Sequence, residues 1–311
     1  MDRVGEAGIR RWQVRVFSRA TEPLMAELPK LTPAVSPGVC LPPPTARRAG
    51  EPGAPQPMGS REVVMHKHIG IVAASPEGAA ICYRDIHRTL AALLGDRGHP
   101  RITLHGEPFE RYIDAVARED WHGIGELLLR SARALKDAGA DFCVLPDNLM
   151  QHAVHLAEPT SPIPWLNMTD LVADAVAGDG RRVVGLIGTK KVMRGSTYQT
   201  LLGLRGVKLI VPSDEEAERI DRIIFRELVL GQAIESSRAR VIESIAQMAR
   251  RGAEAVILGC TEAPLLVSTD NCPLPMYDST QLLADGAVRR SLGDAWAAAV
   301  SRAGAGGASA A

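Results

Sequence analysis

The segment Gly259-Cys260-Thr261-Glu262 places a thiol directly after an apolar run, residues 255–258. A cysteine at the point where a strand turns into a helix meets backbone amides, which stabilise a thiolate and lower the pKa of the thiol. Thr261 offers a hydroxyl and an amide to an anionic ligand, and Glu262 could orient Thr261 or assist proton transfer. The alternative is a buried, unreactive cysteine with Thr261 as a helix cap.

Asp147 becomes a second candidate through an internal repeat. Residues 139–147 (GADFCVLPD) match residues 252–260 (GAEAVILGC), so that Asp147 stands where Cys260 stands. An aspartate in water has a pKa of about 3.9 and is a weak base for an α-carbon proton, but burial in a dry cleft raises that pKa. A protonated Asp147 opposite a thiolate could then supply a proton. The alternative is that Asp147 caps a helix that starts at Asn148.

Four further polar residues are candidates for substrate binding. Ser75 ends the first apolar run, and Asn148 could donate to a substrate carboxylate. Thr189 follows an apolar run and opens an expected helix, so its hydroxyl and amides could bind an α-carboxylate. Lys190 or Lys191 could pair with a side-chain carboxylate. For each position the alternative is a plain turn residue, a helix cap or a solvated lysine.

The elements that must position these residues alternate along the chain. We expect strands at residues 68–73, 101–105, 141–145, 182–187, 207–211 and 255–258. Between them we expect helices at about 77–94, 121–138, 148–156, 191–204, 214–229 and 235–251. Short apolar runs alternating with helical patterns predict an α/β fold, with parallel sheets covered by helices on both faces.

The repeat predicts two pseudo-symmetric, doubly wound α/β domains with the active site in the cleft between them, because parallel sheets bind ligands at the carboxyl ends of their strands. The expected domains are residues 65–163, joined by a C-terminal helix at about 279–300, and residues 164–278, with a flexible tail over 301–311. Residues 1–64 hold ten of the 21 prolines and are predicted to be a disordered extension. We hypothesise that translation starts at Met65.

Composition excludes several classes of function. The 36 basic residues equal the 36 acidic ones and only 4% of residues are aromatic, which argues against nucleic-acid or membrane-surface binding. Apolar runs are too short to predict a membrane span. Five cysteines without Cys-x-x-Cys spacing argue against a disulfide framework and suit a reducing cytoplasm. We find no dinucleotide fingerprint, phosphate-binding loop or metal-ligand cluster, so no cofactor is expected.

Residues 259–266, Gly-Cys-Thr-Glu-Ala-Pro-Leu-Leu, resemble the second catalytic motif of the aspartate/glutamate racemase superfamily. The resemblance runs over about residues 67–295. It also rests on Glu77-Gly78, on residues 146–148 (PDN), on residues 188–191 (GTKK) with Tyr198, and on residues 278–280 (DST). It implies two pseudo-symmetric domains with the substrate between them, no pyridoxal phosphate, and a homodimer.

The sequence departs from that superfamily in the first motif, which is usually Cys-Asn-Thr-x-His. Residues 147–151 read DNLMQ, so Asp147 replaces the first catalytic cysteine, Leu149 the threonine and Gln151 the histidine. A racemase needs one acid/base group on each face of the α-carbon. We therefore hypothesise that Cys260 and Asp147 flank the substrate.

The resemblance implies a cofactor-independent racemase or epimerase of a small amino acid, with aspartate or glutamate as the default substrate. One alternative is a one-thiol decarboxylase of malonate-like acids, in which a single cysteine protonates a planar carbanion. Another is a ligand-binding relative that has lost its activity.

Overall fold

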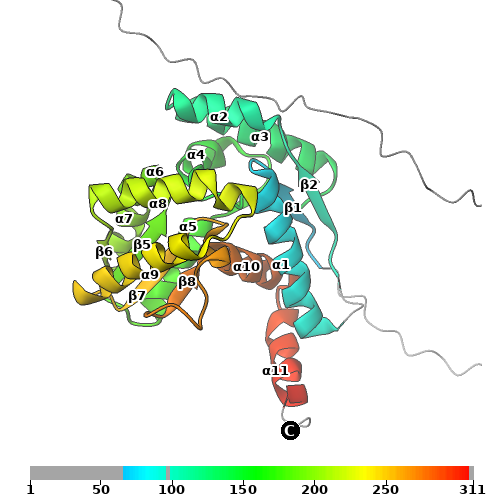
Figure 1. Ribbon diagram of the computed structural model, residues 1–311. Helices are drawn as coiled ribbons and strands as arrows, with labels where there is room; N and C mark the ends of the chain where they lie inside the picture. The colour runs from blue at the N-terminus through cyan, green and yellow to red at the C-terminus, as the bar shows by residue number, and fades with distance from the viewer. Residues whose placement is uncertain (1–65, 96–98, 308–311) are drawn as a thin grey trace, which may run out of the picture. The chain divides into compact units, whose positions relative to one another are not determined.

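The computed structural model of the chain describes residues 66–95 and 99–307 (Figure 1). The predicted disordered extension at 1–64 and the hypothesis of a start at Met65 lie outside these residues.

The first sheet contains four parallel strands in the order β2-β1-β3-β4. They are β1 (Ile69–Val72), β2 (Ile102–His105), β3 (Phe142–Val144) and β4 (Trp165–Leu166). Strand β4 lies beyond the domain boundary expected after residue 163, yet it pairs with β3, so the first sheet continues past that boundary. Two residues make too short an apolar run to be recognised as a strand.

The second sheet repeats the topology of the first. Its strands are β5 (Val183–Gly188), β6 (Lys208–Ile210), β7 (Ala255–Gly259) and β8 (Met276–Asp278), all parallel and in the order β6-β5-β7-β8. Strands β3 and β7 therefore hold equivalent third positions in their sheets, as the alignment of the two repeats predicted. The expected α/β fold with two parallel sheets is confirmed.

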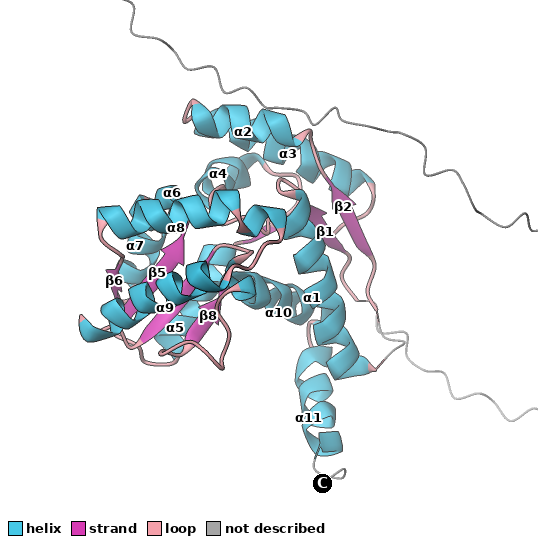
Figure 2. Cartoon of the chain, in the orientation of Figure 1, coloured by secondary structure: helices cyan, strands magenta, loops and turns pink. Residues whose placement is uncertain are grey.

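Eleven α-helices connect and cover these strands in the part of the chain that the structure describes (Figure 2). They are α1 (Pro76–Leu94), α2 (Phe109–Ala117), α3 (Trp121–Asp137), α4 (Gln151–Ala157), α5 (Met168–Gly178), α6 (Lys190–Arg194), α7 (Ser196–Leu204), α8 (Asp214–Arg226), α9 (Glu235–Arg250), α10 (Ser279–Leu292) and α11 (Ala295–Gly307).

Several helical expectations differ from the structure, including the helix expected at 191–204, which is divided into α6 and α7. Helices α2 and α5 were not predicted, and α4 begins at Gln151 rather than at residue 148. The C-terminal helix expected at 279–300 is two helices separated at Gly293, where a positive φ of 53° ends α10. Helix α11 continues to Gly307, so residues 301–307 of the expected flexible tail are helical.

Alternating side chains of β1 pack against helices on both faces of the first sheet. Val72 belongs to the buried cluster that contains α2, α3 and α4 residues, whereas Ile69 and Ile71 belong to the cluster formed with α1 and α10. Helix α10, far along the chain, lies beside α1 in this second cluster (Figure 1). The C-terminal part of the chain thus completes the first half of the fold. A third cluster surrounds the second sheet, with side chains from α5 to α9.

The ends of β5 and β7 approach each other closely at Gly188. A Cβ atom there would lie 2.6 Å from the carbonyl oxygen of Gly259, the residue that precedes Cys260. Backbone contacts of this kind cannot yield without moving a strand. Glycine at position 188 therefore allows β7 to present Cys260 in its observed place.

We expect Gly188→Ala to lower the free energy of unfolding by about 1–3 kcal/mol, because the added methyl group overpacks the strand ends. Urea denaturation at constant m-value measures this change. Gly203→Ala is the matched control, since a Cβ at this helical position meets no atom within 4 Å and should be neutral or slightly stabilising. Equal stabilities of the two variants would contradict the close approach.

Candidate active site

A cavity of about 100 Å³ lies where the carboxyl ends of strands from both sheets meet. Parallel sheets commonly bind ligands at this edge. Seven of the eight residues singled out from the sequence line the cavity: Ser75, Asp147, Asn148, Thr189, Cys260, Thr261 and Glu262. They follow β1, β3, β5 and β7, so each half of the repeat contributes two segments. Lys190 does not line it, and neither does its alternative Lys191.

Asp147 lies in the turn between β3 and α4 and is held by its neighbours. Its Oδ1 accepts a hydrogen bond of 3.0 Å from the amide of Met150. The Gln151 amide braces the same turn, since its Nε2 donates to the carbonyl oxygens of Leu145 (2.8 Å) and Asp147 (3.0 Å). Asp147 therefore caps the turn, as the structural alternative proposed, while it also lines the cavity.

Burial changes the acidity of Asp147. Loss of solvation, with a smaller contribution from the charge of Glu262, raises the pKa of the Asp147 carboxyl from 3.8 to about 6. This value lies just below neutral pH. Asp147 is therefore mostly a carboxylate at pH 7, but a considerably stronger base than an exposed aspartate.

Cys260 is buried, and its thiol donates a hydrogen bond of 3.1 Å to Oε2 of Glu262. Burial, followed by the nearby charge of Glu262, raises the pKa of the Cys260 thiol well above its usual value. The segment after Cys260 is a single turn of 3₁₀ helix, Ala263–Leu265, rather than an α-helix. The backbone amides of Glu262 and Ala263 act to lower the thiol pKa, as expected from the sequence, but burial and Glu262 outweigh them, so the predicted net lowering of the pKa is wrong for this structure.

The two groups consequently hold opposite protonation states at neutral pH. Cys260 keeps its proton, while Asp147 has lost most of its own. The sequence-based hypothesis had the reverse arrangement, a protonated Asp147 opposite a thiolate. The cavity thus offers one base and one acid of different chemical types.

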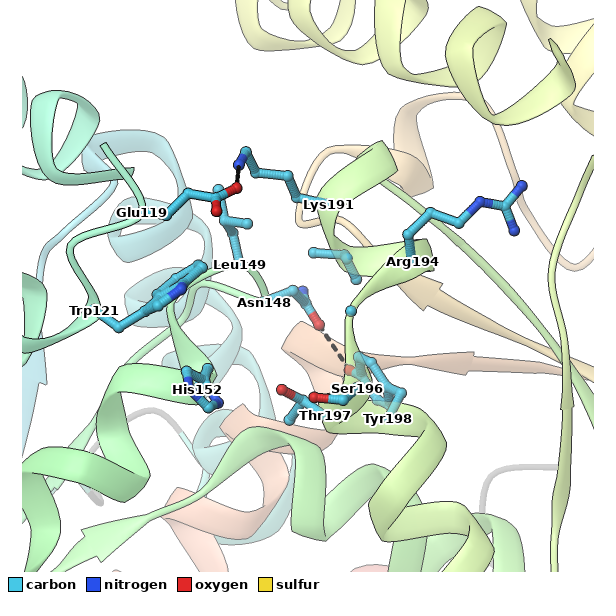
Figure 3. A pocket seen from close by; sticks show the side chains of 12 residues that line it. Glu119, Trp121, Asn148, Leu149, His152, Lys191, Arg194, Ser196, Thr197 and Tyr198 are labelled. Carbon is cyan, nitrogen blue, oxygen red and sulfur yellow. Dashed lines mark hydrogen bonds and ion pairs between the residues drawn. The ribbon is translucent and has the colours of Figure 1, made fainter. Parts of the chain in front are cut away.

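The side chain of Asn148 is committed to a buried chain of hydrogen bonds. Its Oδ1 accepts from the Tyr198 hydroxyl at 2.7 Å (Figure 3), and its Nδ2 donates to Ser279 Oγ at 2.9 Å. Ser279 in turn donates to the carbonyl oxygen of Leu258 at 2.8 Å. These contacts join the Asp147 turn to the end of β7. They leave Asn148 one amide proton that it could donate to a substrate.

Two hydroxyl groups in the cavity cap helices and keep a proton to donate. The Ser75 hydroxyl accepts from the amide of Gly78 at 3.3 Å, and the Thr189 hydroxyl accepts from the amide of Val192 at 3.3 Å. A hydroxyl that accepts one hydrogen bond can still donate another. Both residues, with the buried Thr261, remain available to hold an anionic group.

Neither lysine of the segment after β5 contacts the thiol cavity. Lys190 pairs through Nζ with Glu218 of α8 at 2.7 Å, and it does not line the cavity. Lys191 pairs with Glu119 at 2.8 Å, and Figure 3 shows its ammonium group directed at that carboxylate. The Lys190 ammonium group is thus paired with a surface carboxylate outside this cavity, and binding of the substrate by Lys190 stays a prediction.

The mouth of the cavity is apolar, which the sequence did not suggest. Phe109 and Ile113 of α2, Phe225 of α8 and Val229 all line the cavity and remain more than 40% exposed. Residues 109, 112, 113 and 116 are all apolar or aromatic, the spacing of one helical face. That signal could have revealed α2.

A second pocket of about 340 Å³ adjoins the first and shares Asn148, Leu149 and Val192 with it (Figure 3). His152 lines this second pocket, and its ring meets the Trp121 ring edge-on with centroids 5.4 Å apart. This contact explains the position of His152 by packing.

Two further features of the described residues bear on function. No three His, Cys, Asp or Glu side chains in residues 66–95 and 99–307 are grouped closely enough to hold a metal ion. No helix in the same ranges has the length and apolar character needed to cross a membrane.

We expect Glu262→Gln to speed alkylation of Cys260, because the substitution removes the negative charge that raises the thiol pKa. Below the pKa, each unit by which the pKa falls increases the thiolate fraction about tenfold. Iodoacetamide labelling at pH 8, followed by peptide mass spectrometry, measures the rate at residue 260. The surface variant Glu243→Gln is the control. An unchanged rate in Glu262→Gln would show that this carboxylate does not influence the thiol.

Comparison with known proteins identifies the family. The family model for Asp/Glu/hydantoin racemases matches residues 71–287. A glutamate racemase from Thermus thermophilus is 30% identical over 197 residues, which are 61% of this chain and 65% of that protein, so the chain spans less than two thirds of this relative. The crystal structure of a candidate Asp/Glu racemase from Yersinia pestis has 31% identity and a TM-score of 0.68, covering 73% of this chain and 99% of that one. An aspartate racemase homologue from Pyrococcus horikoshii has 27% identity and a TM-score of 0.66, covering 72% and 99%. The chain belongs to the Asp/Glu/hydantoin racemase family.

Proposed function

We propose that the protein is a cofactor-independent racemase or epimerase of a small amino acid, in which Asp147 and Cys260 exchange protons with opposite faces of the α-carbon. One observation carries the proposal: Asp147 and Cys260, from equivalent positions of the two repeats, line one small cavity, and burial raises the pKa of both groups. Membership of the racemase family supports it.

The first step in one direction uses Asp147 as the base. Its carboxylate removes the α-proton, and the electron pair of the broken C–H bond stays on the α-carbon as a carbanion. The Cys260 thiol then delivers its proton to the opposite face, which inverts the centre and leaves a protonated Asp147 and a thiolate. The other enantiomer reverses these steps, with the thiolate as base and protonated Asp147 as acid.

The remaining polar groups suit the recognition of an α-amino acid. The hydroxyl groups of Ser75, Thr189 and Thr261 would donate hydrogen bonds to the α-carboxylate. These hydrogen bonds would become stronger as the negative charge of the carbanion delocalises into that carboxylate. The substrate ammonium group would lie near the carboxylates of Asp147 and Glu262. Glu262 would also orient the Cys260 proton through the hydrogen bond of 3.1 Å.

Aspartate and glutamate are the first substrates to test, because related proteins are named for them. Free thiols at Cys82, Cys143, Cys260 and Cys272 support a reducing compartment such as the cytoplasm. The family resemblance is the ground for proposing a homodimer.

A one-thiol decarboxylase of malonate-like acids is the second candidate, since the first motif lacks a cysteine. In such an enzyme, loss of CO₂ generates the carbanion and Cys260 alone protonates it. Release of CO₂ from a substituted malonate, without hydrogen exchange at the α-carbon of any amino acid, would favour it. A binding protein without activity would show neither.

Hydrogen exchange in heavy water tests the racemase proposal. We expect the protein to introduce deuterium at the α-carbon of an amino acid, with loss of optical purity. Proton NMR measures the deuterium uptake, and chiral chromatography measures the optical purity. Cys260→Ala and Asp147→Asn should each lower racemisation by about 10²–10⁴-fold, because each removes one acid/base group.

Cys272→Ala is the matched control, since this thiol is only half-buried and does not line the cavity. Full racemisation in both directions by Asp147→Asn would eliminate Asp147 from the mechanism. Full activity of Cys260→Ala would refute the proposal.

A further inference from the structure

The described residues that line the cavity of Asp147 and Cys260 include no lysine, arginine or histidine. The cavity does contain two carboxyl groups, those of Asp147 and Glu262. The other polar contributors are hydroxyl and amide side chains. The walls therefore contain negative charge and neutral donors, but no cation that could neutralise a second carboxylate of a substrate.

The three cations that follow Thr189 along the chain are engaged elsewhere. Lys190 pairs with Glu218 at 2.7 Å and Lys191 with Glu119 at 2.8 Å. Arg194 pairs with Asp214 at 2.7 Å and also donates to the carbonyl oxygen of Pro212 at 2.9 Å. Moving any of them to the substrate would break an ion pair and leave its carboxylate partner unpaired.

A dicarboxylic amino acid would fit this charge distribution poorly. Its α-ammonium group can offset only part of the negative charge of Asp147 and Glu262, and its α-carboxylate already requires the neutral donors. The side-chain carboxylate would then lie close to like charges in a site with little water, where repulsion is screened weakly. An uncharged side chain avoids this repulsion.

The shape and apolar character of the cavity favour the same kind of substrate. Five apolar side chains line it: Phe109, Ile113, Ile224, Phe225 and Val229. Contact between these side chains and a hydrocarbon side chain of the substrate is favourable, because it buries apolar surface. A carboxylate would lose its hydration there without gaining hydrogen bonds. At about 100 Å³, the cavity itself is small, which favours a short side chain.

We propose that the preferred substrate is an α-amino acid with a short, uncharged side chain, rather than aspartate or glutamate. This inference rests on the proposed racemase function and specifies its substrate class. It depends on the walls of the cavity and not on which of the two groups acts as base.

Pairs of substrates that match in shape but differ in charge test the proposal. Asparagine is compared with aspartate, glutamine with glutamate, and 2-aminobutyrate serves as a short apolar substrate. The readout is kcat/KM for deuterium exchange at the α-carbon. We expect 2-aminobutyrate and asparagine to exceed aspartate by about tenfold or more, because like charges in a buried site are strongly unfavourable.

Faster exchange of aspartate or glutamate than of their neutral partners would overturn this inference and leave the racemase proposal standing. Exchange of none of these amino acids by the folded protein would overturn both. The two failures are therefore distinguishable within one experiment.

A charge placed at the mouth provides an independent test. Val229 is 44% exposed and lines the cavity, so Val229→Lys should be tolerated and should supply the missing cation. We expect it to raise the ratio of kcat/KM for aspartate to that for asparagine by about tenfold at low salt. Leu204→Lys, at a position 78% exposed and outside the cavity lining, should leave the ratio unchanged. An unchanged ratio in Val229→Lys would contradict the proposal.

Discussion

Burial of two side chains in one cavity is the constraint on which the proposed chemistry depends. Burial is the largest cause of the shifted pKa at both Asp147 and Cys260, and in each it favours the neutral form. The outcome differs because the two groups start from different values, 3.8 for the carboxyl and 9.0 for the thiol. With its raised pKa, the Asp147 carboxyl still ionises below neutral pH, whereas the Cys260 thiol, with its raised pKa, does not. The same dry environment therefore yields a base and an acid, and it also disfavours a further negative charge on the substrate.

A second requirement is that two separate sheets present these groups to each other. The identical strand order of the sheets places Asp147 and Cys260 after equivalent strands, β3 and β7. The buried chain from Tyr198 through Asn148 and Ser279 then joins the turn of the first group to the strand of the second. Buried polar networks of this kind rigidify a structure when every member is satisfied. Asn148 is thus better described as a positioning residue than as a free donor to the substrate.

The sequence predicted the architecture well because apolar runs and the internal repeat report burial directly. It placed Asp147 and Cys260 at corresponding strand ends from nine aligned residues. It failed where the decisive information is long-range. The sequence does not reveal that Lys190 pairs with Glu218 of α8, which lies 28 residues further along the chain. The raised pKa of Cys260 depends mainly on burial and then on the carboxylate of Glu262, and burial is not visible in local composition. Strand β4 was missed because two residues form no pattern.

The ionisation of Asp147 tests this account most directly. Carbon-13 NMR of protein labelled at aspartate carboxyl groups, recorded from pH 3 to pH 9 and compared with Asp147→Asn, identifies its resonance. The account predicts one carboxyl resonance that titrates near pH 6 and is missing from the variant, in agreement with the pKa of about 6 set mainly by burial. If the resonance lost in Asp147→Asn instead titrated near the value of about 3.9 of an exposed aspartate, the cavity would be well hydrated, and the assignment of Asp147 as a strengthened base would be wrong.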